Sequence, residues 1–100
     1  MKLTNEFEPI RNWALERNLY EKGDVKTQFI KLTEEIGELS RSILKKDDLE
    51  FIDAIGDCVV VLTNLAKLNN MNIEDCINSA YDVIAKRTGK MVNNTFVKDE

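Results

Sequence analysis

Apolar residues recur every three or four positions along most of this chain, which is the spacing of a helix with one buried face. The pattern predicts four helices, over residues 5–19, 25–44, 48–68 and 73–88. The apolar side of the first carries Phe7, Ile10, Trp13, Ala14 and Leu15, and the core stripe of the second carries Phe29, Leu32, Ile36, Leu39 and Ile43. The third is rich in valine and isoleucine, so a strand is the alternative there, but its length favours a helix.

The predicted helix boundaries coincide with residues that satisfy free backbone groups at helix ends. The residues at predicted helix starts are Asp24, Asp47 with Glu50, and Asn72. The residues at predicted helix ends are Lys45, Lys46 and Gly89. The tail, residues 90–97, is predicted to form a small β-hairpin that turns at Asn93-Asn94. We therefore expect one domain, residues 1–100, of the all-α class: a helical bundle of about four helices with a short C-terminal hairpin-like tail.

Size and composition narrow the range of functions. A chain of 100 residues, 43% of them hydrophobic, supports only a small core, so we expect oligomerisation, as a homodimer or homotetramer, to complete the bundle. The net charge of −4 and the lack of a basic run argue against a nucleic-acid partner. The absence of histidine removes the commonest general base and the commonest zinc ligand.

The cellular location is indicated by the cysteines and by the apolar runs. Cys58 and Cys76 stand in apolar contexts without CxxC spacing, so we expect reduced core residues rather than a disulfide. The chain shows no signal-peptide pattern and no apolar run long enough to cross a membrane. These features predict a soluble, cytoplasmic protein with no membrane partner.

Two acidic clusters stand on consecutive predicted helices. The first contains Glu34, Glu35 and Glu38, and the second pairs Asp53 with Asp57 directly before an apolar run. Carboxylates three or four residues apart share a helix face and repel one another unless a cation lies between them. If the two helices pack antiparallel, four carboxylates can surround one cavity. An all-oxygen site of this kind suits a hard cation, Mg²⁺ or Mn²⁺.

The acidic residues also have plainer explanations. A glutamate-rich helix face is usually solvated, and Glu50 fits a helix cap better than a metal ligand. Asp57 is harder to explain in this way, because five apolar residues follow it. Gly56 costs roughly 1 kcal/mol relative to alanine inside a helix, which indicates the close approach of another helix or of a ligand.

The two clusters together resemble a known family. Residues 32–39, LTEEIGEL, followed by residues 55–62, IGDCVVVL, are similar to the EExxE and ExxD motifs of the MazG-like nucleotide pyrophosphohydrolases, in the all-α NTP pyrophosphatase superfamily. Short phage-type members resemble this arrangement. The chain departs from the family pattern at the first position of ExxD, which is Ala54, and Asp53 is the candidate replacement for the missing carboxylate.

The resemblance implies an enzyme, a Mg²⁺-dependent nucleoside triphosphate pyrophosphohydrolase that cleaves a (d)NTP to the (d)NMP and pyrophosphate. Glu35, Glu38 and Asp57 would hold the metal, with Asp53 or Glu34 completing its shell. Glu34 would also orient or deprotonate the attacking water.

The same resemblance implies a set of substrate-binding residues. Basic residues would neutralise the phosphates, and an aromatic ring would stack on the base: Lys31, Lys86, Arg87 and Lys90, and Trp13. The plainer explanations are cations that complement a helix dipole and an aromatic residue of the core or of an interface. Ala54 leaves open a catalytically weak nucleotide or alarmone-binding regulatory protein of the same fold. A helical interaction module without a metal is the third alternative.

Overall fold

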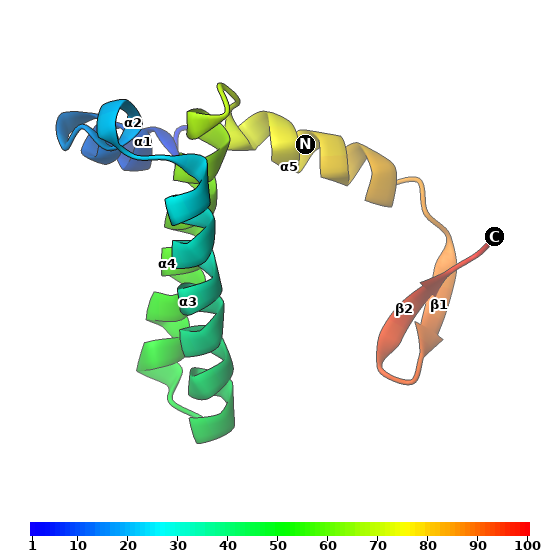
Figure 1. The fold of residues 1–100 in the computed structure, drawn as a ribbon. Coiled ribbons are helices and arrows are strands. Elements are labelled where there is room, and N and C mark those ends of the chain that lie inside the picture. Colours follow the sequence, from blue (N-terminus) through cyan, green and yellow to red (C-terminus); the bar gives the residue numbers. More distant parts are fainter.

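The computed structural model describes all residues from 1 to 100. It contains five helices and one two-stranded sheet, in the order α1 (Glu8–Glu16), α2 (Leu19–Lys22), α3 (Val25–Lys45), α4 (Asp48–Leu68), α5 (Ile73–Ile84), β1 (Gly89–Val92) and β2 (Thr95–Lys98) (Figure 1). The predicted all-α class and the predicted C-terminal hairpin are both confirmed.

Helices α3 and α4 form an antiparallel pair that makes up the centre of the molecule (Figure 1). Both begin where local chemistry predicts. The side chain of Asp24 accepts a hydrogen bond from the Thr27 amide at 2.7 Å, and that of Asp47 accepts one from the Glu50 amide at 3.1 Å. Helix α3 ends at Lys45, and the φ of 55° at the C-cap residue Lys46 turns the chain toward α4. These caps fix the length and register of the pair.

The N-terminal segment differs from the single helix predicted over residues 5–19. Asn18 has a left-handed backbone with φ 61°, which separates α1 from the short α2. This break lets α2 fold back onto α4, where the Tyr20 hydroxyl donates a hydrogen bond of 2.6 Å to Oδ1 of the buried Asn64.

The C-terminal segment also differs in detail. Helix α5 ends at Ile84 rather than at residue 88. Asn72 is its N-cap residue, as predicted, but its side chain makes no capping hydrogen bond. The hairpin turns at Asn93 and Asn94, which have φ of 50° and 69°. Two successive left-handed residues are typical of a type I′ turn, which suits the twist of a two-residue hairpin.

Few side chains are buried in this chain. The buried apolar residues are Ala14, Ala54, Val61 and Ile73. Phe29, Ile36 and Ile43, which were predicted to face the core, are 55%, 51% and 58% exposed, because a second layer of helices does not cover this face of α3. Both cysteines are free, as predicted, but Cys76 is exposed rather than part of the core.

The overall dimensions agree with this open arrangement. The accessible surface is 7781 Å², whereas a compact monomer of this mass exposes about 5,800 Å². The radius of gyration is 16.1 Å, against about 13 Å for a compact chain of this length. None of the helices combines the length and the apolarity that crossing a membrane requires.

Candidate metal centre

The antiparallel packing of α3 and α4 brings acidic residues of both helices together. Glu35 and Glu38 of α3 and Asp57 of α4 each offer a carboxylate oxygen, and these oxygens lie within 4.8 Å of one another. We call these three residues the carboxylate cluster. Glu35 and Glu38 stand one turn apart on α3, so both reach the same side of the helix pair. The sequence prediction that the two acidic helices face each other is borne out for these three side chains.

Glu35 is the buried member of the carboxylate cluster, with only 5% of its surface exposed. Its Oε1 atom lies 3.4 Å from Nζ of Lys31, one turn earlier on α3. Its Oε2 atom is buried and has no hydrogen-bond partner. A charged oxygen removed from water without a partner costs free energy, which a bound cation at this position would offset.

The carboxylate of Asp57, on α4, is also in an environment that disfavours its negative charge. The pKa of its carboxyl is raised above the ordinary value, first by partial desolvation and then by the negative charges of Glu35 and Asp53. Carboxylates held this close together without a proton or a cation between them repel. The cluster therefore has the electrostatics of a cation site.

The donor set fits a small divalent ion. All three ligands are carboxylate oxygens, the type that Mg²⁺ and Mn²⁺ prefer. Because Mg²⁺ binds oxygen at about 2.1 Å, adjacent ligands of one ion lie about 3 Å apart, so the three oxygens must move closer together to share an ion.

The other predicted acidic residues lie at the margin of this cluster. The side chain of Glu34 is 62% exposed, and its nearest cation is Lys31 at 4.0 Å. Asp53 is exposed one turn before Asp57, close enough to raise the pKa of Asp57 but outside the cluster. Ala54, at the position where the family motif has a carboxylate, is 2% exposed and packs inside the helix pair.

Gly56 does not have the role that its position suggested. A Cβ atom added to it would find no atom within 4 Å outside its own helical turn. No element of this chain therefore approaches α4 closely at Gly56, so the predicted approach of another helix is wrong within this chain, and the approach of a ligand stays a prediction.

A hollow of about 450 Å³ adjoins the cluster. Its lining residues come from α1 and α4: Pro9, Ile10, Trp13, Asp57 and Val60. Asp57 is also a member of the carboxylate cluster. Trp13 is 49% exposed, so the predicted base-stacking residue stands on an accessible, mainly apolar surface next to a candidate metal ligand.

Arg17, which contacts Trp13 of this hollow, is a feature that sequence reasoning missed. Its guanidinium carbon lies 4.5 Å from the centre of the Trp13 ring, and its Nη1 atom donates a hydrogen bond to the Trp13 carbonyl. The pair is spaced i, i+4 at the C-terminal end of α1, where Arg17 is the C-cap residue, and this spacing is the signal that would have found it. The cation fixes the indole ring by covering one of its faces.

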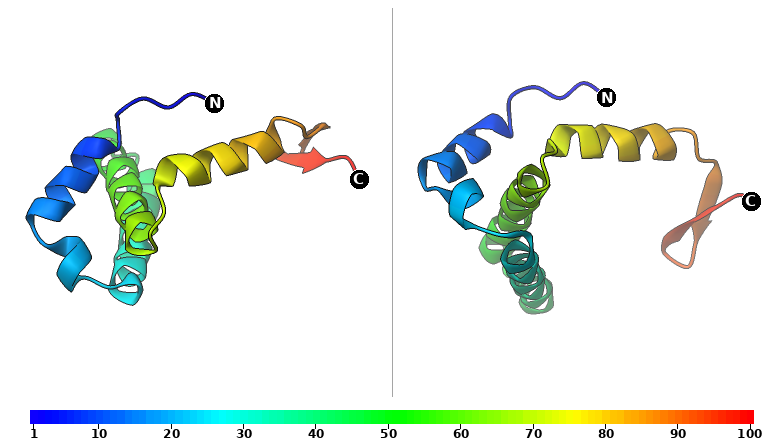
Figure 2. Two further views of the ribbon diagram at one scale, coloured as in Figure 1. Left: turned by 90° about the horizontal axis from the view of Figure 1, so that it is seen from above. Right: turned by 45° about the horizontal axis from the view of Figure 1, so that its top comes forward.

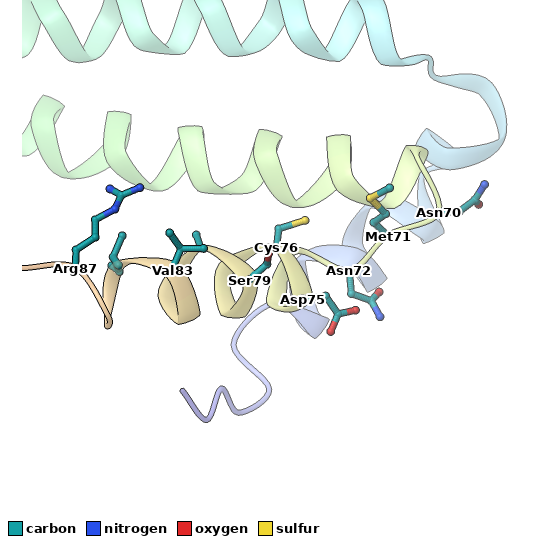
Figure 3. A pocket seen from close by; sticks show the side chains of 10 residues that line it. Asn70, Met71, Asn72, Asp75, Cys76, Ser79, Val83 and Arg87 are labelled. Atoms are coloured by element: carbon teal, nitrogen blue, oxygen red, sulfur yellow. The ribbon is translucent and has the colours of Figure 1, made fainter. Parts of the chain in front are cut away.

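The remaining predicted phosphate-binding residues do not reach the carboxylate cluster of their own chain. Lys86 and Arg87 follow α5, and Lys90 lies in β1. Helix α5 packs against α4 and is joined to α1 by the Arg11–Glu74 ion pair, and the two strands pair with each other. Arg87 instead lines a separate hollow of about 780 Å³ along α5, together with Met71, Cys76 and Val83 (Figure 3).

Taken together, the fold and the site define a helical protein with a carboxylate cluster that could bind a metal ion, beside a hollow that Trp13 lines. The chain belongs to the MazG nucleotide pyrophosphohydrolase domain family, whose model matches residues 24–92. The matched residues include both acidic helices, α3 and α4, and the first strand of the hairpin, β1.

A phage protein is also similar to this chain. It is described as an uncharacterized 18.2 kDa protein in the rep-hol intergenic region of Haemophilus phage HP1 (strain HP1c1), and it is 46% identical over 63 residues. The match covers 63% of this chain and 39% of that protein, so the chain spans about two fifths of that relative's length. No solved structure matches the chain significantly.

Proposed function

We propose that this protein is a Mg²⁺-dependent nucleoside triphosphate pyrophosphohydrolase that cleaves a (d)NTP to the (d)NMP and pyrophosphate. One observation carries the proposal: the buried, unpartnered Oε2 of Glu35 lies in a cluster with Glu38 and Asp57, in a chain of the MazG family. A buried carboxylate of this kind is poorly explained as a solvated helix face, which was the plainer explanation for the motif.

Each residue of the centre has a distinct role in this proposal. Glu35, Glu38 and Asp57 hold the metal, and Asp53 or Glu34 completes its shell. When bound, Mg²⁺ neutralises phosphate charge and lowers the pKa of a water, and Mn²⁺ can replace it. Glu34 is accessible enough to orient that water or accept its proton.

The reaction is a hydrolysis at the α-phosphorus. The water oxygen forms a bond to that phosphorus, the bond to the bridging oxygen breaks, and pyrophosphate leaves. Lys31 is held beside Glu35 at 3.4 Å, where its charge can bind a phosphate oxygen. Trp13, fixed by Arg17, offers its free face to the base.

A second function is favoured by Ala54. Because its methyl group is buried in the helix pair, the fourth motif position supplies no ligand. A site short of one carboxylate can hold its metal mainly through the phosphates of the nucleotide. The protein would then be a catalytically weak nucleotide or alarmone-binding regulator of the same fold.

The open monomer supports a homo-oligomer, a dimer or a tetramer built from dimers. The chain exposes about 2,000 Å² more than a compact monomer of its mass, and obligate homodimers bury roughly 2,000–5,000 Å² in total. Two free cysteines suit a reducing compartment such as the cytoplasm.

A panel of ribo- and deoxyribonucleoside triphosphates, assayed for pyrophosphate with and without Mg²⁺, tests the proposal. We expect Mg²⁺-dependent release from at least one triphosphate, and its loss in Glu38→Gln. Glu21→Gln, an exposed carboxylate on α2 outside the cluster, is the matched control and should retain activity. Nucleotide binding without pyrophosphate release would favour the regulator, and the absence of both would contradict the proposal.

A further inference from the structure

Lys31 is the basic residue that pairs with the carboxylate cluster. Its Nζ atom lies 3.4 Å from Oε1 of the buried Glu35 and 4.0 Å from Oε2 of the exposed Glu34. Glu38 and Asp57 form no ion pair in this chain. Figure 2 shows the chain after α4 leading away from the α3–α4 pair, so the basic residues of that segment do not share the position of Lys31. A single ammonium group therefore faces the negative charge of the cluster.

This one ammonium leaves the cluster incompletely neutralised. Oε2 of Glu35 is buried without a hydrogen-bond partner. The pKa of Asp57 stays raised, by desolvation and then by the charges of Glu35 and Asp53, although Lys31 acts in the opposite direction. A divalent ion carries twice the charge and binds several carboxylate oxygens at once, so it is the stronger partner for these oxygens. Lys31 and a divalent ion thus compete for Glu35.

The contact between Lys31 and Glu35 is loose enough to be exchanged. Its length of 3.4 Å exceeds the distance of about 2.7–2.9 Å that is typical of a charge-assisted hydrogen bond. The lysine precedes the glutamate, which is the weaker of the two orientations for an i, i+4 pair on a helix. The side chain of Lys31 is 53% exposed, against 7% for that of Glu35. The flexible, hydrated ammonium can therefore leave for water, whereas the carboxylate stays buried.

We propose that Lys31 is a displaceable counter-ion of the carboxylate cluster: it pairs with Glu35 in the metal-free protein, leaves Glu35 when a divalent ion binds, and then pairs with a phosphate of the nucleotide. The last step rests on the proposed function, whereas the displacement depends only on the cluster. The same ammonium opposes the binding of a metal alone and favours the binding of a metal together with a polyanion. Metal and nucleotide therefore strengthen each other's binding through Lys31.

A purely structural ion pair would behave differently. It would stay in place when a metal binds, and its removal would leave Glu35 less well held and the metal site weaker. A counter-ion that competes with the metal has the reverse effect, because its removal leaves the carboxylates free for the metal. The two roles of Lys31 thus predict opposite changes in metal affinity.

Isothermal titration of the full-length protein with MgCl₂ alone measures this change. Lys31→Met should bind Mg²⁺ about three- to tenfold more tightly than wild type, because one nearby positive charge is lost at a largely exposed position. Lys67→Met, at an exposed position on α4, changes the net charge equally and should stay within about twofold of wild type. Affinity in Lys31→Met that is equal to the control or weaker would overturn the proposal, and so would the absence of Mg²⁺ binding in both wild type and Lys31→Met.

Chemical labelling of the wild-type protein tests the displacement without a mutation. Brief treatment with acetic anhydride, read by mass spectrometry, gives the acetylation rate of Lys31 relative to Lys67 in the same sample. Saturating Mg²⁺ alone should raise this ratio, because the freed amine is no longer shielded by Glu35. Addition of a non-hydrolysable α,β-imido nucleoside triphosphate should lower it again. A ratio that Mg²⁺ leaves unchanged would overturn the displacement.

The same analogue separates failure of this proposal from failure of the proposed function. Mg²⁺ should strengthen binding of the analogue less in Lys31→Met than in wild type, and an equal effect in both would overturn the coupling. If the wild-type protein releases no pyrophosphate but Lys31→Met binds Mg²⁺ more tightly, the proposed function fails and the displacement stands. If pyrophosphate is released but Lys31→Met binds Mg²⁺ like Lys67→Met, the function stands and the counter-ion proposal fails.

Discussion

At the scale of the residue, Glu35 is the side chain whose environment most needs an explanation. Its carboxylate is buried, one oxygen faces Lys31, and the other has no partner. The pKa of Asp57 is raised in part by the charge of Glu35. Both effects make the metal-free protein less stable than the same fold with the repulsion removed.

Replacing Glu35 by glutamine tests whether its buried charge destabilises the metal-free protein. Glu35→Gln removes a buried charge and adds an amide that can donate to Asp57, so the metal-free protein should gain on the order of 1 kcal/mol in free energy of unfolding. The same variant should lose the rise in melting temperature that Mg²⁺ gives to wild type. Urea denaturation without metal and thermal melts with Mg²⁺ measure the two effects, and a variant that still responds to Mg²⁺ would remove Glu35 from the site.

Asp53 is the residue proposed to compensate for Ala54. Because it is exposed and stands one turn from Asp57, Asp53→Asn should weaken Mg²⁺ binding several-fold and slow pyrophosphate release while leaving the fold intact. Isothermal titration measures the affinity, and Asp48→Asn, also on α4, is the control. Wild-type affinity in Asp53→Asn would show that Asp53 is a solvated charge.

At the scale of the element, the Arg11–Glu74 pair joins α1 to α5. It is shielded from water, with Arg11 and Glu74 side chains 9% and 23% exposed, and Glu8 adds a third partner at 2.9 Å from Arg11. The guanidinium of Arg11 lowers the pKa of Glu74. This pair therefore stabilises the folded state when Glu74 is ionised.

Breaking this pair should have a pH-dependent cost. Glu74→Gln should lower the free energy of unfolding by about 2 kcal/mol at neutral pH, because it leaves Arg11 partly unpaired. The folded-state pKa of Glu74 is depressed, so the stabilisation is present above its unfolded value and is lost as the pH falls through the folded value. Urea titrations of wild type and variant should therefore converge in acid, and a difference that persists there would contradict the assignment.

The elements also show what local sequence determines. The caps at Asp24 and Asp47 and the Asn93-Asn94 turn were predictable, because each depends on neighbours within three residues. The left-handed Asn18 was not, since its conformation is selected by the docking of Tyr20 onto Asn64, 44 residues away.

The candidate site also has a part that the sequence indicates and a part that depends on distant contacts. The carboxylate cluster follows from helical spacing and antiparallel packing, both of which the sequence indicates. The position of Lys86, Arg87 and Lys90 depends on the direction of α5, which the Arg11–Glu74 contact sets across 63 residues. Spacing along the chain carries no signal for a contact of that kind.

At the scale of the whole molecule, the open shape and the exposed apolar face of α3 predict an oligomer. Ile43 is 58% exposed in the single chain. If a second copy covers this face, Ile43→Lys should shift the protein toward monomer, whereas Ser40→Lys, a change at a polar exposed position, should not. Sedimentation velocity at micromolar concentration makes the comparison. A well-folded wild-type monomer would contradict the proposed assembly.

The central claim is that the carboxylate centre directs water to the α-phosphorus of a nucleoside triphosphate. Hydrolysis in ¹⁸O-labelled water, with Mg²⁺ and a triphosphate that the protein turns over, tests it most directly, because the label marks the phosphorus that was attacked. The proposed function predicts one ¹⁸O atom in the nucleoside monophosphate and none in the pyrophosphate. Label in the pyrophosphate, or the release of labelled orthophosphate with a nucleoside diphosphate, would contradict the account.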